Sequence, residues 1–214
     1  MNNINLKKLR NQILEQAKKH VEKKGWSEQI LLDVARDSKF KYSEIALLFP
    51  KGYSTLLEMY LNTINDKMTE GSRKINLIQL RVHQRIKELI VLRLRIMSNE
   101  KKLISKTYFH LLLPQNFKLA SKCLYKVVDQ TWFLAGDQST DFNFYTKRGI
   151  LASIYSTVIL HFINNNNLDQ TIDILNKQLK RVSKIPKIKN KFKKIKDIIP
   201  RVFKLINNIG FLKQ

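Results

Sequence analysis

Side chains that could carry catalysis are few and scattered in this sequence. The four histidines, His20, His83, His110 and His161, are far apart, and none belongs to a Glu-x-x-His, His-Glu-x-x-His or Cys-x-x-Cys pair of the kind that holds a metal ion. No glycine-rich loop could cradle a phosphate, and Ser139 lacks the glycine-flanked turn of a hydrolase nucleophile. We therefore expect a protein that is not an enzyme and that holds no metal and no cofactor.

The stretch WFLAGDQSTDFNFYTKR, which begins at Trp132, is better suited to recognition than to catalysis. Gly136 fits the left-handed end of a helix, and Ser139 or Thr140 can cap the helix that follows. The stretch therefore predicts a corner between two helices. Neighbouring residues on a helix point about 100° apart, so Trp132 and Phe133 rarely both face one core. We expect Phe133 on the surface and leave Trp132 open between the core and a docking surface.

Helical periodicity runs through nearly the whole chain, since apolar residues recur every three or four positions. With 6 Gly and 4 Pro, the sequence has too little turn chemistry for a β-sandwich. We expect a first helix over residues 4–24 and a second helix that begins after Ser27, whose side chain can cap it. Further helices are expected over 41–48, 53–68, 72–99, 101–113, 116–135, 140–164 and 168–184. The sequence therefore predicts an all-α fold.

The length of 214 residues suits one core with a small appended module. We divide it into an N-terminal helix-turn-helix-like unit over residues 1–68, a C-terminal helical domain over 69–184 and a basic tail over 185–214. The single cysteine, Cys123, excludes an intramolecular disulfide and fits a reducing compartment. The N-terminus lacks the apolar core of a signal peptide, so we expect a cytoplasmic protein.

The basic tail predicts contact with an anionic membrane surface. Residues 177–204 hold twelve of the 40 Lys and Arg residues and one Asp, within a net charge of +23. Apolar residues recur there at helical spacing opposite the lysines, as in helices that lie in the membrane interface. The residues assigned to the membrane are Ile188, Phe192, Ile195, Ile199 and Phe203, with Lys187, Lys191 and Lys194. Docking onto protein is the main alternative, and nucleic acid is the least favoured partner.

The segment VARDSKFKYSEIALLFPKGYSTLL, from Val34, resembles the helix-turn-helix of tetracycline-repressor-like regulators. Phe49 and Pro50 match that pattern, but Lys39 stands where a glycine is expected. Glu44 adds a negative charge to the face that would meet DNA phosphates, which weakens binding. The resemblance therefore implies the fold more strongly than the function. A ligand-sensing helix-turn-helix transcription regulator stays as the alternative function.

The corner and the helices on both sides of it resemble the C-terminal domain of the coenzyme Q (ubiquinone) biosynthesis protein nine family. The run AGDQSTDFNFYTKR, from Ala135 to Arg148, is the most specific part, and the resemblance extends from about Ile13 to Lys180. It implies a tetracycline-repressor-like helical fold, a homodimer and a non-catalytic accessory protein that binds an isoprenoid lipid or phospholipid. From the basic tail we expect peripheral association with the inner face of a membrane.

The resemblance also implies a lipid site and a protein partner. Family members are thought to deliver ubiquinone precursors, which are polyprenyl quinones, to the di-iron demethoxyubiquinone hydroxylase. We assign docking of that enzyme to Asp129, Trp132, Phe133 and Asp137. Nine residues on successive amphipathic helices are assigned to the lipid chamber: Tyr108, Phe109, Leu112, Tyr125, Val128, Phe144, Leu151, Tyr155 and Ile159. Without the resemblance, an ordinary packed core is the simpler interpretation of these nine residues.

Overall fold

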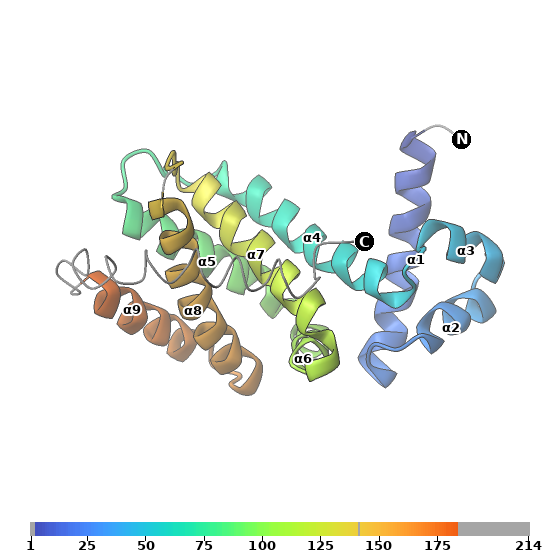
Figure 1. The fold of residues 1–214 in the computed structure, drawn as a ribbon. Coiled ribbons are helices and arrows are strands. Elements are labelled where there is room, and N and C mark those ends of the chain that lie inside the picture. The colour runs from blue at the N-terminus through green and yellow to red at the C-terminus, as the bar shows by residue number, and fades with distance from the viewer. Residues whose placement is uncertain (1–2, 141, 184–214) are drawn as a thin grey trace, which may run out of the picture. The chain divides into compact units, whose positions relative to one another are not determined.

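The structure is a computed structural model that describes residues 3–140 and 142–183 (Figure 1). Over these residues the chain forms α1 (Asn3–Lys24), α2 (Gln29–Asp37), α3 (Tyr42–Leu48), α4 (Tyr53–Ser72), α5 (Val82–Ser98), α6 (Lys101–Leu111), a short 3-10 turn (Pro114–Asn116), α7 (Phe117–Leu134), α8 (Phe142–Asn164) and α9 (Leu168–Ser183). No strand occurs within the described ranges. The predicted all-α fold is confirmed.

The helices α1, α2 and α3 pack beside one another (Figure 1). Ile13 and Val21 lie on the predicted apolar stripe of α1 and are fully buried. The helix ends at Gly25, which has φ +81° and donates its N–H to the carbonyl of Val21 at 2.8 Å. Just beyond it, the indole N–H of Trp26 donates to Thr107 Oγ1 on α6 at 2.9 Å. This buried bond ties the N-terminal helices to the rest of the fold.

The start of α2 differs from the prediction of a Ser27 side-chain cap. No side-chain cap bond forms at this helix end, and the backbone carbonyl of Ser27 accepts the N–H of Ile30 at 3.1 Å instead. The helix is held to α1 through Asp33, whose buried carboxylate accepts a hydrogen bond from Lys24 Nζ at 2.6 Å. Burying an unpaired carboxylate costs free energy, so losing the contact with Lys24 would be unfavourable. The contact therefore holds α2 against α1.

The predicted single helix over residues 72–99 is wrong. α4 continues to Ser72, and α5 begins only at Val82. The side chain of Arg85 explains the interruption, because its guanidinium takes over backbone acceptors that a continuous helix would satisfy itself. It donates to three carbonyl oxygens, those of Leu80, Ile78 and Ala135, at 2.8, 3.1 and 3.0 Å. The intervening backbone is thereby tied to the end of α7.

The main core forms where α4, α5 and α7 lie side by side and α8 packs against α6 and α7 (Figure 1). Its fully buried residues include Leu57, Leu89 and Val158. Burying one such side chain contributes about 1.5–3 kcal/mol. At the C-terminal end of α8, the ammonium of Lys101 donates to the carbonyl oxygens of Phe162 and Asn165. A cation at this end also complements the helix dipole.

The contacts divide the chain into Met1–Asn176 and Lys177–Gln214. The described part of the second unit is the final stretch of α9. α4 runs through the boundary predicted after residue 68. The predicted tail domain, 185–214, and all residues assigned to the membrane, from Lys187 to Phe203, lie outside the described residues. None of the described helices combines the length and the apolar character needed to cross a bilayer.

Candidate functional site

An apolar groove of about 210 Å³ opens between α6, α7 and α8. Leu111 of α6, Leu124 and Val127 of α7 and Ile163 of α8 supply much of its wall. Three small residues, Ala120, Ser121 and Ser156, face the same space. Small side chains leave room where larger ones would close the gap between packed helices. These three positions therefore leave space in the groove that larger side chains would fill.

Large apolar side chains surround the opening of this groove. Leu112, Phe117 and Leu160 line it and are also exposed to solvent. Single exposed apolar residues are common on proteins, but a cluster that rims a pocket is typical of an interaction site. The rim defined by these three residues continues the apolar surface of the groove outward.

Two tyrosines line the groove in addition to the two serines. The hydroxyl oxygens of Tyr108 and Tyr155 lie 2.8 Å apart, and both side chains line the groove. Behind them, Arg93 Nε donates to the Tyr155 hydroxyl at 2.8 Å and Nη1 donates to Asn65 Oδ1 at 2.5 Å. Arg93 is fully buried. Burial raises the pKa of Tyr108 well above its usual value of 10, so its hydroxyl stays protonated.

Cys123 also lines the groove as a small, buried side chain. Burial raises the pKa of its thiol to about 11. The thiolate is the reactive form of cysteine. At neutral pH this residue therefore contributes an apolar surface to the groove and no nucleophile.

The structure brings together four of the nine residues assigned to the lipid chamber. Tyr108, Leu112, Tyr155 and Ile159 line the groove. The other five lie elsewhere: Val128 and Leu151 are buried away from it, Phe109 and Tyr125 are exposed, and Phe144 packs over a guanidinium. Helical periodicity assigns residues to a face but does not show which faces of α6, α7 and α8 meet.

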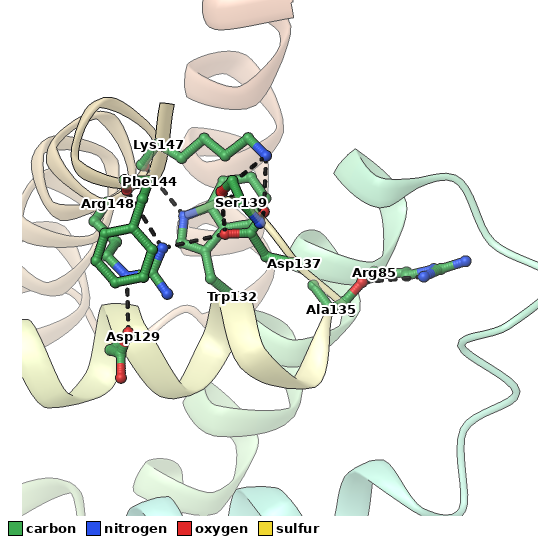
Figure 2. Close-up of polar contacts among 9 residues, drawn as sticks. All are labelled: Arg85, Asp129, Trp132, Ala135, Asp137, Ser139, Phe144, Lys147 and Arg148. Atoms are coloured by element: carbon green, nitrogen blue, oxygen red, sulfur yellow. Dashed lines mark hydrogen bonds and ion pairs between the residues drawn. The ribbon is translucent and has the colours of Figure 1, made fainter. Parts of the chain in front are cut away.

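The end of α7 forms the predicted corner (Figure 2). Gly136 has φ +81° and donates its N–H to the carbonyl of Phe133 at 3.0 Å. The N–H of Asp137 donates to the carbonyl of Trp132 at 3.0 Å, which completes a helix-ending pair of backbone bonds. Ser139, predicted as a cap, donates its hydroxyl to the Asp137 carboxylate at 2.8 Å. The left-handed backbone of this turn thus requires the glycine that the sequence has at position 136.

Two carboxylates and two cations hold the corner against α8. Figure 2 shows the guanidinium of Arg148 between Asp129 and Asp137, with the ring of Phe144 stacked on it. Arg148 Nε donates to Asp129 Oδ1 at 2.7 Å, and Nη1 donates to Asp137 Oδ2 at 3.1 Å. Lys147 Nζ donates to Asp137 Oδ1 at 2.7 Å. This arrangement joins α7, the corner and α8.

The carboxylate of Asp137 is held in its charged form. Its side chain is 2% exposed. Burial alone would raise its pKa, but hydrogen bonds from Lys147, Ser139 and Arg148 together lower the pKa to about 2 from the usual 3.8. Asp137 is therefore inaccessible to a partner, and any part it takes in docking would act through the shape of the corner.

Trp132 and Phe133 occupy different environments, as adjacent helical positions require. The indole N–H of Trp132 donates to the carbonyl of Lys147 at 3.1 Å, and Lys147 Nζ lies 5.4 Å from the centre of the ring system. Trp132 is therefore half-buried in the corner. Phe133 is 70% exposed, as expected, and Asp129 is partly exposed. The assignment of these residues to docking stays a prediction.

The two histidines that lie among apolar residues have partners within the fold. His110 Nε2 lies 3.3 Å from the Tyr53 hydroxyl, and burial lowers the pKa of this histidine. His161 Nδ1 lies 3.0 Å from Thr171 Oγ1. Neither residue lines the groove. Across residues 3–140 and 142–183, no three His, Cys, Asp or Glu side chains gather to hold a metal ion.

Comparison with known sequences finds relatives of this chain. The COQ9 family model matches residues 117–186. The mitochondrial ubiquinone biosynthesis protein COQ9 of Homo sapiens is 30% identical over 168 residues, which cover 75% of this chain and 52% of the human protein. The probable ubiquinone biosynthesis protein coq9 of Dictyostelium discoideum, also mitochondrial, is 27% identical over 177 residues, covering 76% and 55%. The chain thus spans about half the length of the curated relatives it matches.

Comparison with solved structures bears on the fold. The crystal structure of a TetR transcriptional regulator from Nitrosomonas europaea superimposes with a TM-score of 0.66 over 82% of this chain and 98% of the regulator. The two sequences are 17% identical. The predicted tetracycline-repressor-like fold is therefore confirmed, and this likeness shows the fold alone.

Proposed function

Because residues 117–186 match the COQ9 family model and the chain is similar to ubiquinone biosynthesis proteins over 75% of its length, we propose that this protein is a non-catalytic, lipid-binding accessory protein of ubiquinone biosynthesis. Its ligand would be an isoprenoid lipid, specifically a polyprenyl quinone precursor. The protein would present this ligand to the di-iron demethoxyubiquinone hydroxylase. The finding that carries the proposal is the apolar groove with its exposed apolar rim.

The size of the groove limits how much of a ligand it can enclose. Its 210 Å³ is smaller than the roughly 300–1,000 Å³ of pockets that bury a drug-sized ligand. A polyprenyl quinone would therefore place only one end in the groove. The remainder would lie over the rim formed by Leu112, Phe117 and Leu160. Each Å² of apolar surface covered in this way contributes about 25 cal/mol, which offsets the cost of removing the lipid from a bilayer.

The chemistry of the groove wall supports binding rather than catalysis. The polar side chains of the wall are two tyrosines, two serines and one cysteine, and burial raises the pKa of both Tyr108 and Cys123. A general base needs a pKa near the working pH, and a nucleophilic cysteine needs a lowered one. These groups are therefore suited to contact with a ligand and not to proton abstraction or attack.

The corner between α7 and α8 supports the proposed docking surface. Phe133 presents a large exposed aromatic side chain three residues before Gly136, the glycine of the turn that ends α7. The Asp137–Arg148 contact fixes the corner, so the backbone that carries this ring is held in place before a partner arrives. Rigid, exposed aromatic residues are frequent anchors of protein interfaces, because little conformational entropy is lost on binding. We assign contact with the hydroxylase to this surface.

Membrane association completes the proposal. The curated relatives are named as mitochondrial proteins. The basic, amphipathic sequence of the tail is suited to the interface of an anionic bilayer, from which a lipid precursor would be taken. We propose peripheral association with the inner face of the membrane and a homodimer as the working assembly.

Lipid extraction followed by mass spectrometry tests the lipid-binding function. The protein is expressed in cells that make ubiquinone and purified without detergent, and we expect an isoprenoid lipid to co-purify with it. The substitution Ala120→Phe fills the groove and should remove this lipid. Ser153→Phe adds the same ring to an exposed position of α8 outside the groove, and serves as the control. Absence of lipid from the native protein, or equal loading of both variants, would contradict lipid binding in the groove.

A further inference from the structure

We propose that the inner wall of the groove is a donor site for a hydrogen-bond-accepting oxygen in the head group of the bound lipid. The site consists of Tyr108 and Tyr155 with Arg93 behind them. The inference rests on the proposed function, since the lipid must enter the groove. It adds the chemical class of the head group that would enter the groove first. The ligand class is an apolar chain that ends in a carbonyl, carboxylate or phosphate oxygen.

The count of donors and acceptors in this cluster does not balance. Arg93 Nε donates to the Tyr155 hydroxyl at 2.8 Å, and one further bond joins the hydroxyls of Tyr155 and Tyr108 at 2.8 Å. The two hydroxyls carry two protons, but the bond between them uses only one. Whichever tyrosine donates to the other, one hydroxyl proton is left without an acceptor among the described residues. Buried donors are nearly always paired, so this proton marks a place for an acceptor.

The charge of Arg93 leads to the same conclusion independently. The guanidinium is always protonated and is fully buried, yet its partners are the neutral side chains of Tyr155, Asn65 and Tyr108. No carboxylate pairs with it in the described part of the chain, and its Nη2 atom has no hydrogen-bond partner there. A buried charge without a counter-charge is costly. A negatively charged oxygen that accepts a hydrogen bond from the tyrosine hydroxyls would lie near the guanidinium and would lower the free-energy cost of burying its charge.

The position of the cluster explains how such a ligand would lie. Tyr108 and Tyr155 line the groove, and so do the exposed rim residues Leu112, Phe117 and Leu160. A ligand that enters head first would place its oxygen at the hydroxyls and its chain along the rim. Both the surplus donors and the exposed apolar residues would then be satisfied by one molecule.

Binding measurements on the 214-residue chain test the proposal. Isothermal titration calorimetry compares dodecanoate, dodecyl phosphate and a decyl-tailed ubiquinone with dodecyltrimethylammonium, whose similar tail carries a head group without an acceptor oxygen. We expect one or more of the oxygen probes to bind at least about tenfold more tightly than the ammonium probe. The oxygen probe that binds most tightly distinguishes an anionic head group from a quinone carbonyl.

The variant Tyr108→Phe separates head-group recognition from chain binding. It removes one hydroxyl, keeps the ring that lines the groove and leaves Arg93 bonded to Tyr155. We expect it to reduce the affinity for the preferred oxygen probe about tenfold and to leave the ammonium probe unchanged. Tyr155→Phe, which removes the partner of Arg93, should reduce the same affinity by at least as much, and its thermal unfolding is recorded beside it to show that it folds.

Two results would overturn the proposal. If the ammonium probe binds as tightly as every oxygen probe, or if Tyr108→Phe binds the preferred oxygen probe like the native protein, the donor site does not exist. Binding that persists in these cases and is removed by Ala120→Phe leaves the proposed lipid groove intact. If no probe binds at all, the lipid groove fails and the donor site fails with it.

Discussion

The Nη1 atom of Arg148 lies 3.1 Å from Oδ2 of Asp137, and both side chains are buried. The same guanidinium also pairs with Asp129 at 2.7 Å. One side chain therefore holds the last turns of α7, the corner after it and the first turns of α8 together. This relationship holds the helix end that carries Phe133, and the proposed docking surface needs that support.

The substitution Asp137→Asn should change how the protein unfolds in acid. The pKa of Asp137 is about 2 in the folded protein and 3.8 ordinarily. Because the folded value is the lower one, this group stabilises the fold above pH 3.8, and the effect is lost as the pH falls toward 2. At about 1.4 kcal/mol for each pKa unit, it contributes about 2 kcal/mol at neutral pH. Asp137→Asn should therefore unfold at a lower temperature at pH 7 and lose less further stability between pH 4 and pH 2.

Asp129→Asn is the matched control for that experiment. Asp129 contacts the same arginine, but its side chain is 41% exposed. Exposed ion pairs contribute about 1 kcal/mol or less. Thermal unfolding followed by circular dichroism between pH 7 and pH 2 should therefore show the acid-dependent loss of stability both in this control and in the native protein. Parallel curves for Asp137→Asn and the native protein would contradict the assignment to Asp137.

Alanine should destabilise the fold by different amounts at two glycines that share the same backbone angle. Gly25 and Gly136 both have φ +81°, so alanine costs about 1 kcal/mol or more at either position. A Cβ at Gly25 would meet no atom within 4 Å, but a Cβ at Gly136 would lie 3.2 Å from Arg85 Nη1. That guanidinium is held by three carbonyl oxygens and cannot easily move. Gly136→Ala should therefore destabilise by about 1 kcal/mol more than Gly25→Ala in urea unfolding, and equal losses would argue against Arg85 as a fixed neighbour.

The features that the sequence predicts correctly depend on local chemistry. Gly25 and Gly136 end their helices because the left-handed turn needs glycine, and this requirement is visible within a few residues. The exposure of Phe133 follows from the angle between neighbours on a helix. Both kinds of inference need no knowledge of how distant segments pack.

The features that the sequence misses depend on distant partners. The break between α4 and α5 is stabilised by Arg85, which reaches the carbonyl of Ala135, 50 positions along the chain. The groove depends on which faces of α6, α7 and α8 meet, and its small residue Ala120 gives no apolar signal of its own. Arg93 lies within the largely apolar run from Leu89 to Met97 and could have been noticed as a buried cation, but its tyrosine partners come from α6 and α8.

The substitution Phe133→Ala should weaken binding to the hydroxylase without affecting the fold. The ring is 70% exposed, so its removal leaves no cavity in the core. Aromatic anchors at interfaces contribute about 2 kcal/mol or more, which corresponds to a loss of affinity of at least about thirtyfold. Trp132→Ala is a poorer test, because the Trp132 indole also donates to the carbonyl of Lys147 in the corner.

Leu47→Ala provides the control for this docking experiment. Leu47 is 83% exposed on α3, so its truncation also removes a large apolar side chain from the surface. Surface plasmon resonance with the purified di-iron hydroxylase should show native affinity for Leu47→Ala and weak binding for Phe133→Ala, with equal melting temperatures. Native affinity in both variants would exclude Phe133 as an anchor.

Reversing three charges in the tail should release the protein from anionic vesicles. The variant replaces Lys187, Lys191 and Lys194 by glutamate. Because each cation contributes about 1 kcal/mol at an anionic surface, losing all three should reduce binding roughly a hundredfold or more. The control makes the same charge change at three exposed lysines outside the tail, Lys39, Lys51 and Lys74. Co-sedimentation with phosphatidylserine-containing vesicles at low salt measures both. Equal losses would indicate that net charge alone drives binding, and an unchanged tail variant would place the membrane contact elsewhere on the protein.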